Sequence, residues 1–130
     1  MRKKSKLAVV AAGVTALAVF GLAGPAQAAS DTVYTRYWDG LLEYTDSAAD
    51  VDFFVVKDIS ADGYGVRGEI RSGGGTLLSW NYVGGNGTSK SWIYDLAKSK
   101  EYIIRVCLVS GAGDTTPINC ASKVIQDTNP

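Results

Sequence analysis

Short runs of alternating apolar and polar residues, separated by glycine-rich turns, constrain this chain most. In YGVRGEIR, residues 64–71, charged side chains occupy every second position from Arg67 to Arg71. A period of two is typical of a strand with one polar face. The run SGGG at 72–75 predicts a turn, and GGNG at 84–87 predicts another, because glycine and asparagine accept positive φ angles. The pattern therefore predicts strands joined in antiparallel fashion.

The same pattern recurs along the chain and predicts about seven strands. Their ranges are 32–38, 50–59, 64–71, 76–82, 90–94, 102–109 and 119–125. After residue 28 we find no convincing amphipathic helix. Short strands with glycine-rich connections favour an all-β fold, either a small antiparallel β-sandwich or a partly open barrel.

The first 28 residues have the pattern of a secretory signal peptide. A basic start, RKKSK at 2–6, precedes an apolar run from Leu7 to Leu22, and AQA at 26–28 matches the small-x-small site that a signal peptidase recognises. We therefore expect residues 29–130 to form a single secreted domain, whose N-terminal segment 29–40 is either an extended arm or a strand.

Charge excludes two classes of partner. All thirteen acidic residues follow position 28 but only nine of the thirteen basic residues do, so the mature chain carries four more negative than positive charges. Nucleic-acid binding requires clustered Lys and Arg, and an anionic membrane surface attracts the same clusters. We expect neither nucleic acid nor membrane as a partner after signal cleavage.

The two cysteines, Cys107 and Cys120, are predicted to form a disulfide. An exported chain meets an oxidising environment, and the spacing differs from the C-x-x-C of redox pairs. The chain has no histidine, which disfavours a zinc site. Closing a loop of this length stabilises a fold by about 3 kcal/mol in the chain-entropy model.

The acid–base inventory favours a protein that is not an enzyme. Without histidine there is no Ser-His or Cys-His nucleophile system. Carboxylate pairs that would suit a glycosidase, Asp50 with Asp52 or Asp58 with Asp62, look the same in sequence as solvated polar residues.

We expect no cofactor and no metal, although one motif is close to a calcium loop. Asp58, Ser60, Asp62 and Glu69 nearly fit the pattern D-x-[DN]-x-[DN]-G-x₅-E. The flanking segments are predicted strands, whereas the motif requires helices. We therefore interpret residues 61–63 as a hairpin turn and Glu69 as a cross-strand ion-pair partner on the solvent face of a strand.

Aromatic residues supply two candidate binding surfaces. If the strands on either side of the GGNG turn pair, Trp80, Tyr82, Trp92 and Tyr94 line one face and could stack sugar rings or anchor a protein. The alternative is that these four rings form the core. The second candidate is the segment after the signal peptide, with contact residues Val33, Tyr34, Arg36, Tyr37 and Trp38.

The signal peptide, the run DGYGVR at 62–67 and the ending from Arg105-Val106-Cys107 to Asn119-Cys120 carry a resemblance. The chain resembles small secreted single-domain β-sandwich proteins of filamentous Gram-positive bacteria. In size and layout it is similar to the adaptor subunit of umbrella toxin particles, which links a large toxin polypeptide to a lectin-bearing subunit through an N-terminal extension. The resemblance implies that residues 33–38 belong to a linking arm.

The sequence thus predicts a secreted, non-enzymatic protein-binding module, an adaptor in an extracellular toxin complex whose partner is another secreted protein. The first alternative is a carbohydrate-binding module that binds a glycan on the aromatic face. A small secreted inhibitor or toxin is the second alternative, including one that acts as an enzyme through paired carboxylates.

Overall fold

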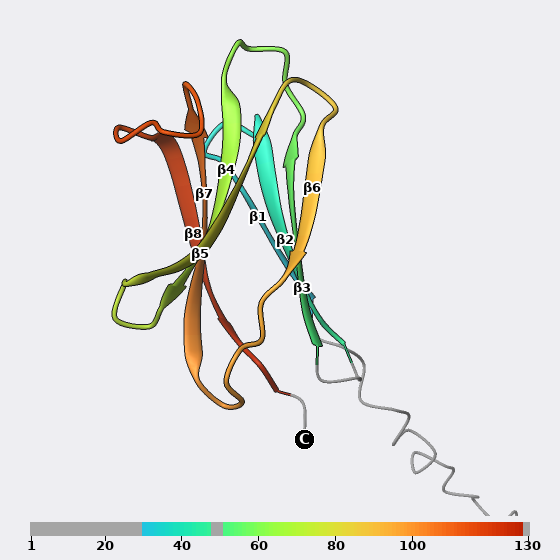
Figure 1. The fold of residues 1–130 in the computed structure, drawn as a ribbon, viewed down its shortest axis with the longest axis vertical. Coiled ribbons are helices and arrows are strands. Elements are labelled where there is room, and N and C mark those ends of the chain that lie inside the picture. Colours follow the sequence, from blue (N-terminus) through green and yellow to red (C-terminus); the bar gives the residue numbers. More distant parts are fainter. Residues whose placement is uncertain (1–29, 48–50, 129–130) are drawn as a thin grey trace, which may run out of the picture.

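The computed structural model describes residues 30–47 and 51–128, which form eight strands and no helix (Figure 1). The predicted signal peptide and Asp50 lie outside the described residues. The strands are β1 (Ser30–Tyr34), β2 (Gly40–Ser47), β3 (Val51–Asp58), β4 (Gly65–Ser72), β5 (Leu77–Gly84), β6 (Ser89–Ile93), β7 (Glu101–Val109) and β8 (Ile118–Gln126).

Two antiparallel sheets of four strands face each other. The first sheet has the order β1-β2-β3-β6 and the second has the order β5-β4-β7-β8. Every pair of neighbouring strands is antiparallel. In Figure 1 the two sheets run side by side along the vertical axis, and the loops gather at the top and bottom ends. The all-β prediction is confirmed, and of its two forms the structure is a sandwich.

The core fills the space between the sheets, as strand alternation requires. In the first sheet Leu42, Phe54 and Val56 are fully buried, and in the second sheet Val66 and Ile104 are fully buried. The Phe54 ring lies at the centre of an aromatic row, 5.3 Å from the ring of Tyr44 and 5.6 Å from that of Trp92. This row runs across three neighbouring strands of the first sheet and lines its core-facing side.

The sequence prediction missed β2 and therefore counted seven strands. β2 lies between β1 and β3, and its residues Leu42 and Tyr44 point into the core. The predicted strand at 32–38 ran through most of the turn at 35–39, and no strand was predicted between it and the one at 50–59, where β2 lies. That predicted strand ends at Tyr34 in the structure.

The expected pairing of β5 with β6 is wrong. β5 belongs to the second sheet, whereas β6 pairs with β3 in the first, with Trp92 opposite Phe54. The GGNG segment does turn the chain, and Gly85 and Gly87 have φ angles of 107° and 83°. Turn chemistry shows that the chain reverses direction, but it does not specify which sheet the next strand joins.

The predicted disulfide is present and joins Cys107 of β7 to Cys120 of β8. The register between these strands shifts between Val106 and Leu108, next to the cysteine on β7. The bond faces outward from the second sheet, because the neighbouring Val106 and Leu108 belong to the core.

Candidate functional site

A buried carboxylate marks the outer face of the second sheet. On β4, Val66 and Ile70 point into the core, so the alternating positions Arg67, Glu69 and Arg71 point outward. Glu69 is nevertheless fully buried. Its place on an outward-facing strand position means that other side chains must cover it.

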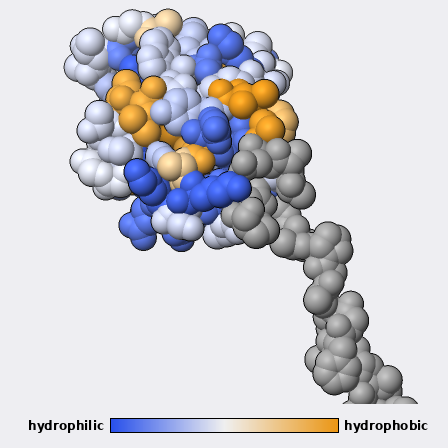
Figure 2. All heavy atoms as spheres, turned by 60° about the horizontal axis from the view of Figure 1, so that its bottom comes forward, coloured by the Kyte–Doolittle hydropathy of each residue, from blue (hydrophilic) through white to orange (hydrophobic). Residues whose placement is uncertain are grey.

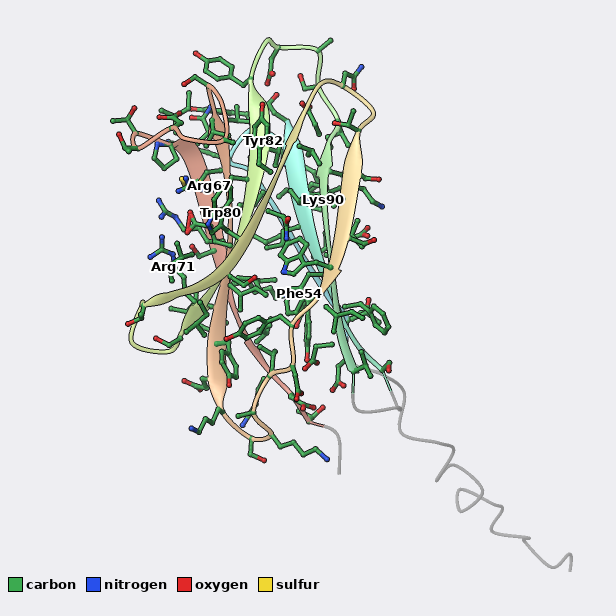
Figure 3. The ribbon with its side chains drawn as sticks, in the orientation of Figure 1. Phe54, Arg67, Arg71, Trp80, Tyr82 and Lys90 are labelled. Carbon is green, nitrogen blue, oxygen red and sulfur yellow. A yellow bond between two sulfur atoms is a disulfide. The ribbon has the colours of Figure 1, made fainter. Side chains whose placement is uncertain are left out.

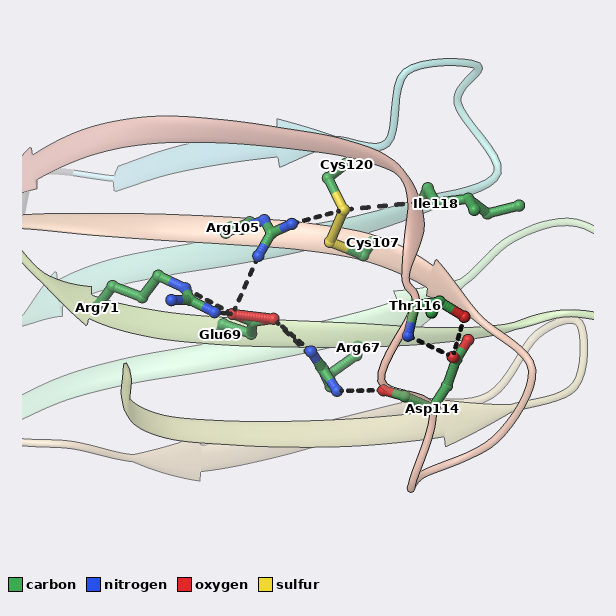
Figure 4. The surroundings of a disulfide bond; sticks show 9 residues. All are labelled: Arg67, Glu69, Arg71, Arg105, Cys107, Asp114, Thr116, Ile118 and Cys120. Carbon is green, nitrogen blue, oxygen red and sulfur yellow. Dashed lines mark hydrogen bonds and ion pairs between the residues drawn. A yellow bond between two sulfur atoms is a disulfide. The ribbon is translucent and has the colours of Figure 1, made fainter. Parts of the chain in front are cut away.

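Three arginines cover Glu69, as Figure 4 shows. Nη2 of Arg67 lies 2.8 Å from Oε1, and Nε of Arg71 donates to Oε2 at 2.7 Å. The third is Arg105, directly opposite on β7, whose Nη1 is 3.8 Å from Oε2. One carboxylate therefore organises three guanidinium groups, an arrangement that we call the arginine cluster: Arg67, Glu69, Arg71 and Arg105.

Glu69 is ionised in this setting. Burial on its own raises the pKa of the Glu69 carboxyl, but the hydrogen bonds and charges of Arg67 and Arg71 outweigh burial and lower the pKa below its ordinary value. The cluster therefore carries a net charge of about +2 at neutral pH, on a chain with more acidic than basic residues after position 28.

Each arginine is also held from a second side. Nη1 of Arg67 donates to the backbone oxygen of Asp114 at 3.0 Å, and Nη1 of Arg71 donates to that of Gly75 at 2.9 Å. Nη2 of Arg105 lies 3.2 Å from Sγ of Cys120 in the disulfide. Side chains fixed in this way lose little conformational entropy when a partner binds.

Trp80 extends the cluster into a mixed apolar and cationic surface. It lies opposite Glu69 on β5, is 43% exposed, and its ring centre is 5.8 Å from the guanidinium carbon of Arg67. In Figure 3 Trp80, Arg67 and Arg71 lie on the outer side of the second sheet, away from Phe54. Leu77 and Val124 are exposed, and their register with Arg71 and Ile103 places them on this face.

The predicted row of four aromatic residues is not formed. Trp80 and Tyr82 lie on the outer side of the second sheet, opposite Glu69 and Arg67. Trp92 and Tyr94 pack against the core instead. The two pairs are separated because β5 and β6 are in different sheets, so these rings do not form one sugar-stacking surface.

The predicted N-terminal contact segment divides into a strand and a turn. Val33 is buried in the core, and β1 pairs with β2, so the structure selects the alternative in which this segment is the first strand of its own sheet. The exposed part is the β1–β2 turn, where Tyr37 and Trp38 are 62% and 66% exposed. The ring of Tyr34 lies 4.2 Å from that of Trp38.

This turn has an unusual backbone. Trp38 has a φ of 66°, a conformation that is uncommon for a bulky residue. Thr35 is buried and holds the turn: its Oγ1 accepts the N–H groups of Asp39 at 2.9 Å and Gly40 at 3.1 Å. The guanidinium of Arg36 lies 5.5 Å from the centre of the Tyr37 ring.

The calcium-loop candidate is contradicted by the partners of its carboxylates. Asp58 accepts the N–H groups of Ser60 at 3.1 Å and Gly85 at 3.0 Å, and Asp62 accepts the N–H of Tyr64. Glu69 faces the arginines. Residues 61–63 do not form the expected hairpin turn, because β3 and β4 belong to different sheets and do not pair. The interpretation of Glu69 as an ion-pair partner is confirmed, although Glu69 is buried rather than solvated.

A second acidic group, which the sequence analysis missed, lies at the bottom end of the sandwich. Asp46, Asp52 and Asp127 are buried and bring carboxylate oxygens within 4.8 Å of one another, so these are the described residues whose geometry could hold a metal ion. Asp52 accepts hydrogen bonds from the N–H of Leu96 at 2.7 Å and the hydroxyl of Tyr44 at 3.1 Å.

The pKa values of Asp46 and Asp52 are raised. Burial is the main cause for Asp46, followed by the charge of Asp127, while the N–H of Thr128 acts in the opposite direction. Burial also raises the pKa of Asp52. A signal for these residues exists in the sequence, because Asp46 continues the core-facing alternation of Leu42 and Tyr44.

The end of the molecule that comes forward in Figure 2 is largely polar. Hydrophobic residues form separate groups among hydrophilic ones in the coloured part of that view. Within ranges 30–47 and 51–128 no helix has the length and apolar character needed to cross a bilayer.

No protein-family model matches the chain, and no curated protein matches it. Among solved structures the chain is similar to an endonuclease/exonuclease/phosphatase from Beutenbergia cavernae DSM 12333, with a TM-score of 0.60 and 24% identity. The match covers 75% of this chain and 27% of that chain. This likeness concerns the fold, and the present chain corresponds to about a quarter of the longer protein.

Proposed function

We propose that this protein is a secreted, non-enzymatic protein-binding module, an adaptor whose main contact surface is the outer face of the second sheet. The observation that carries this proposal is the arginine cluster beside the exposed Trp80. Tryptophan, tyrosine and arginine are the residues that contribute most at protein interfaces. Here the arginines are held in place by Glu69, whose negative charge they already neutralise.

The chemistry of this face indicates the kind of partner. Three guanidinium groups surround a single carboxylate, so a complementary surface would present carboxylates around an apolar centre that covers Trp80. Binding to such a surface weakens as salt is added, because charged groups at the rim are screened. Occurrence of the same fold as part of a longer protein is in keeping with a module.

An adaptor requires two contact surfaces, and the β1–β2 turn offers a second. Arg36, Tyr37 and Trp38 are all exposed there. The N–H of Arg36 bonds to the backbone oxygen of Asn119, so the turn is anchored beside the start of β8. This surface replaces the free N-terminal arm that the resemblance implies.

The proposal is tested by capture of partners from the culture supernatant of the producing organism, using residues 29–130 with a C-terminal tag. We expect a stoichiometric protein partner whose affinity falls at least about tenfold in Trp80→Ala. Ile93→Ala is the matched control, because Ile93 is 61% exposed on β6 of the other sheet.

Two outcomes would change the assignment. Loss of the partner in Trp38→Ala but not in Trp80→Ala would move the main contact to the β1–β2 turn. Absence of a protein partner, with retention on insoluble polysaccharide, would favour the carbohydrate-binding alternative.

A further inference from the structure

A groove at the top end of the sandwich adjoins the outer face of the second sheet, since its lining residue Tyr82 lies opposite Arg67. It has a volume of about 510 Å³ and is formed by the loops β3–β4, β5–β6 and β7–β8 together with the ends of β4 and β5. Sites for small ligands fall between about 300 and 1,000 Å³. The groove is therefore large enough for a ligand of moderate size.

Two glycines shape the floor of this groove around Tyr82. Gly65 and Gly84 are register partners on β4 and β5. A Cβ on Gly65 would lie 2.3 Å from the Tyr82 ring, and a Cβ on Gly84 would lie 2.5 Å from its hydroxyl oxygen. Neither glycine has a positive φ angle, so the close approach of the aromatic side chain explains them, and the position of Tyr82 depends on both.

The loops that flank the groove are fixed by Asp58. Its carboxylate accepts N–H groups from Ser60 in the β3–β4 loop and from Gly85 in the β5–β6 loop. Its backbone oxygen accepts the N–H of Gly87 at 2.8 Å. Asp58 is buried, so its charge is directed into the loop backbone. The walls are thus preorganised.

The chemistry of the lining is neutral. Of the lining residues, none carries a charged side chain. Two are tyrosines, Tyr82 and the 42% exposed Tyr64, and three others offer hydroxyl or amide groups: Ser60, Asn86 and Ser110. Aromatic rings next to neutral hydrogen-bonding groups match a ligand that has apolar faces and many hydroxyls.

From this combination we propose that the groove binds a neutral glycan. A sugar ring stacks on Tyr64 or Tyr82, while its hydroxyls bond to Ser60 and Asn86. The site differs from the aromatic row expected from the sequence, since it uses only Tyr82 of those four residues. Its lining includes neither Trp80 nor a residue of the arginine cluster, although Tyr82 borders that surface.

The test uses the mature chain and soluble oligosaccharides. Neutral hexamers of β-glucan, chitin, mannan and galactan are titrated by calorimetry, with sulfated and sialylated oligosaccharides as charged comparisons. We expect at least one neutral member to bind, and affinity to fall at least tenfold in Tyr64→Ala and in Asn86→Ala. Amide NMR shifts on binding should centre on Gly63, Gly85 and Asn86.

Tyr37→Ala is the matched control, an exposed tyrosine at the β1–β2 turn outside the groove lining. Tyr64 is itself exposed, so Tyr64→Ala should keep the fold. Failure of every neutral glycan to bind would overturn the proposal, as would equal loss in Tyr37→Ala. Trp80→Ala should leave glycan binding unchanged, which separates this test from that of the protein-binding surface.

Discussion

Two of the regions in which the molecule buries carboxylates treat them in opposite ways. On the outer face of the second sheet, Glu69 is surrounded by arginines and its pKa is lowered. At the bottom end of the sandwich, Asp46 and Asp52 lie next to Asp127 and their pKa values are raised. Burial is common to both regions, so the charge of the neighbours decides the direction of the shift.

The two regions consequently link stability to pH with opposite signs. Because the pKa of Glu69 is lowered in the folded state, its carboxylate stabilises the fold at pH values above 4.5, the ordinary pKa of a glutamate. This contribution is lost as the pH falls from 4.5 through the lowered pKa. The raised pKa values of Asp46 and Asp52 act the other way. Above pH 3.8 the unfolded chain releases protons from Asp46 and Asp52 that the folded chain still holds. The free energy of unfolding therefore falls as the pH rises from 3.8 through the raised pKa values of the folded state.

The largest effect is expected from Glu69→Gln. Removing the carboxylate leaves three arginines facing one another, which we expect to lower the free energy of unfolding by roughly 2–4 kcal/mol at pH 7. The difference from wild type should shrink as the pH falls below 4.5, because the unfolded chain then binds a proton at Glu69 while the folded chain, with its lowered pKa, takes one up only at lower pH. Urea unfolding at a series of pH values measures both. A difference that stays constant with pH would contradict the assigned role of Glu69.

A smaller effect of the opposite sign is expected from Asp46→Asn. An amide removes one buried charge next to Asp127, and its oxygen can still accept the N–H of Thr128. The melting temperature should therefore rise by a few degrees at pH 7. The fall of stability with rising pH above 3.8 should flatten as well. Destabilisation at pH 7 would mean that the ionised Asp46 supports the fold.

The smallest effect is expected from Lys57→Gln on the outer face of the first sheet. Lys57 Nζ lies 3.1 Å from Glu43 Oε2, and both side chains are more than a third exposed. Solvent screens such a pair, so the loss should stay below about 0.5 kcal/mol and vanish in high salt. If Lys57→Gln lowered the free energy of unfolding as much as Glu69→Gln does, the difference in burial between the two ion pairs would not explain their contributions to stability.

Local patterns predicted the parts of the structure that depend on neighbouring residues. Alternation located seven of the strands, and the Arg67-x-Glu69-x-Arg71 spacing placed these three side chains on one face. The spacing could not show that Arg105 comes from β7 to complete the cover over Glu69. The destination of β6 was likewise non-local, since it depends on Trp92 packing next to Phe54 across a strand pair.

The acidic group illustrates the same limit. Asp46 and Asp52 flank one connection, but Asp127 reaches them only after the chain has formed both sheets. No window of sequence contains all three residues. The groove at the top end is likewise assembled from three loops. Its floor depends on the close approach of Tyr82 to Gly65 and Gly84, which no local pattern indicates.

The disulfide has a consequence for resistance to proteolysis. Cys107 and Cys120 enclose the whole β7–β8 loop, whose residues 110–117 include exposed positions that a protease could reach. A single cut there leaves two polypeptide pieces that remain covalently joined. β8 would stay paired with β7, and Arg105 would keep its contact with Cys120. A cut would loosen the bond from Arg67 to the backbone oxygen of Asp114, while the ion pairs of the arginines with Glu69 lie outside the loop.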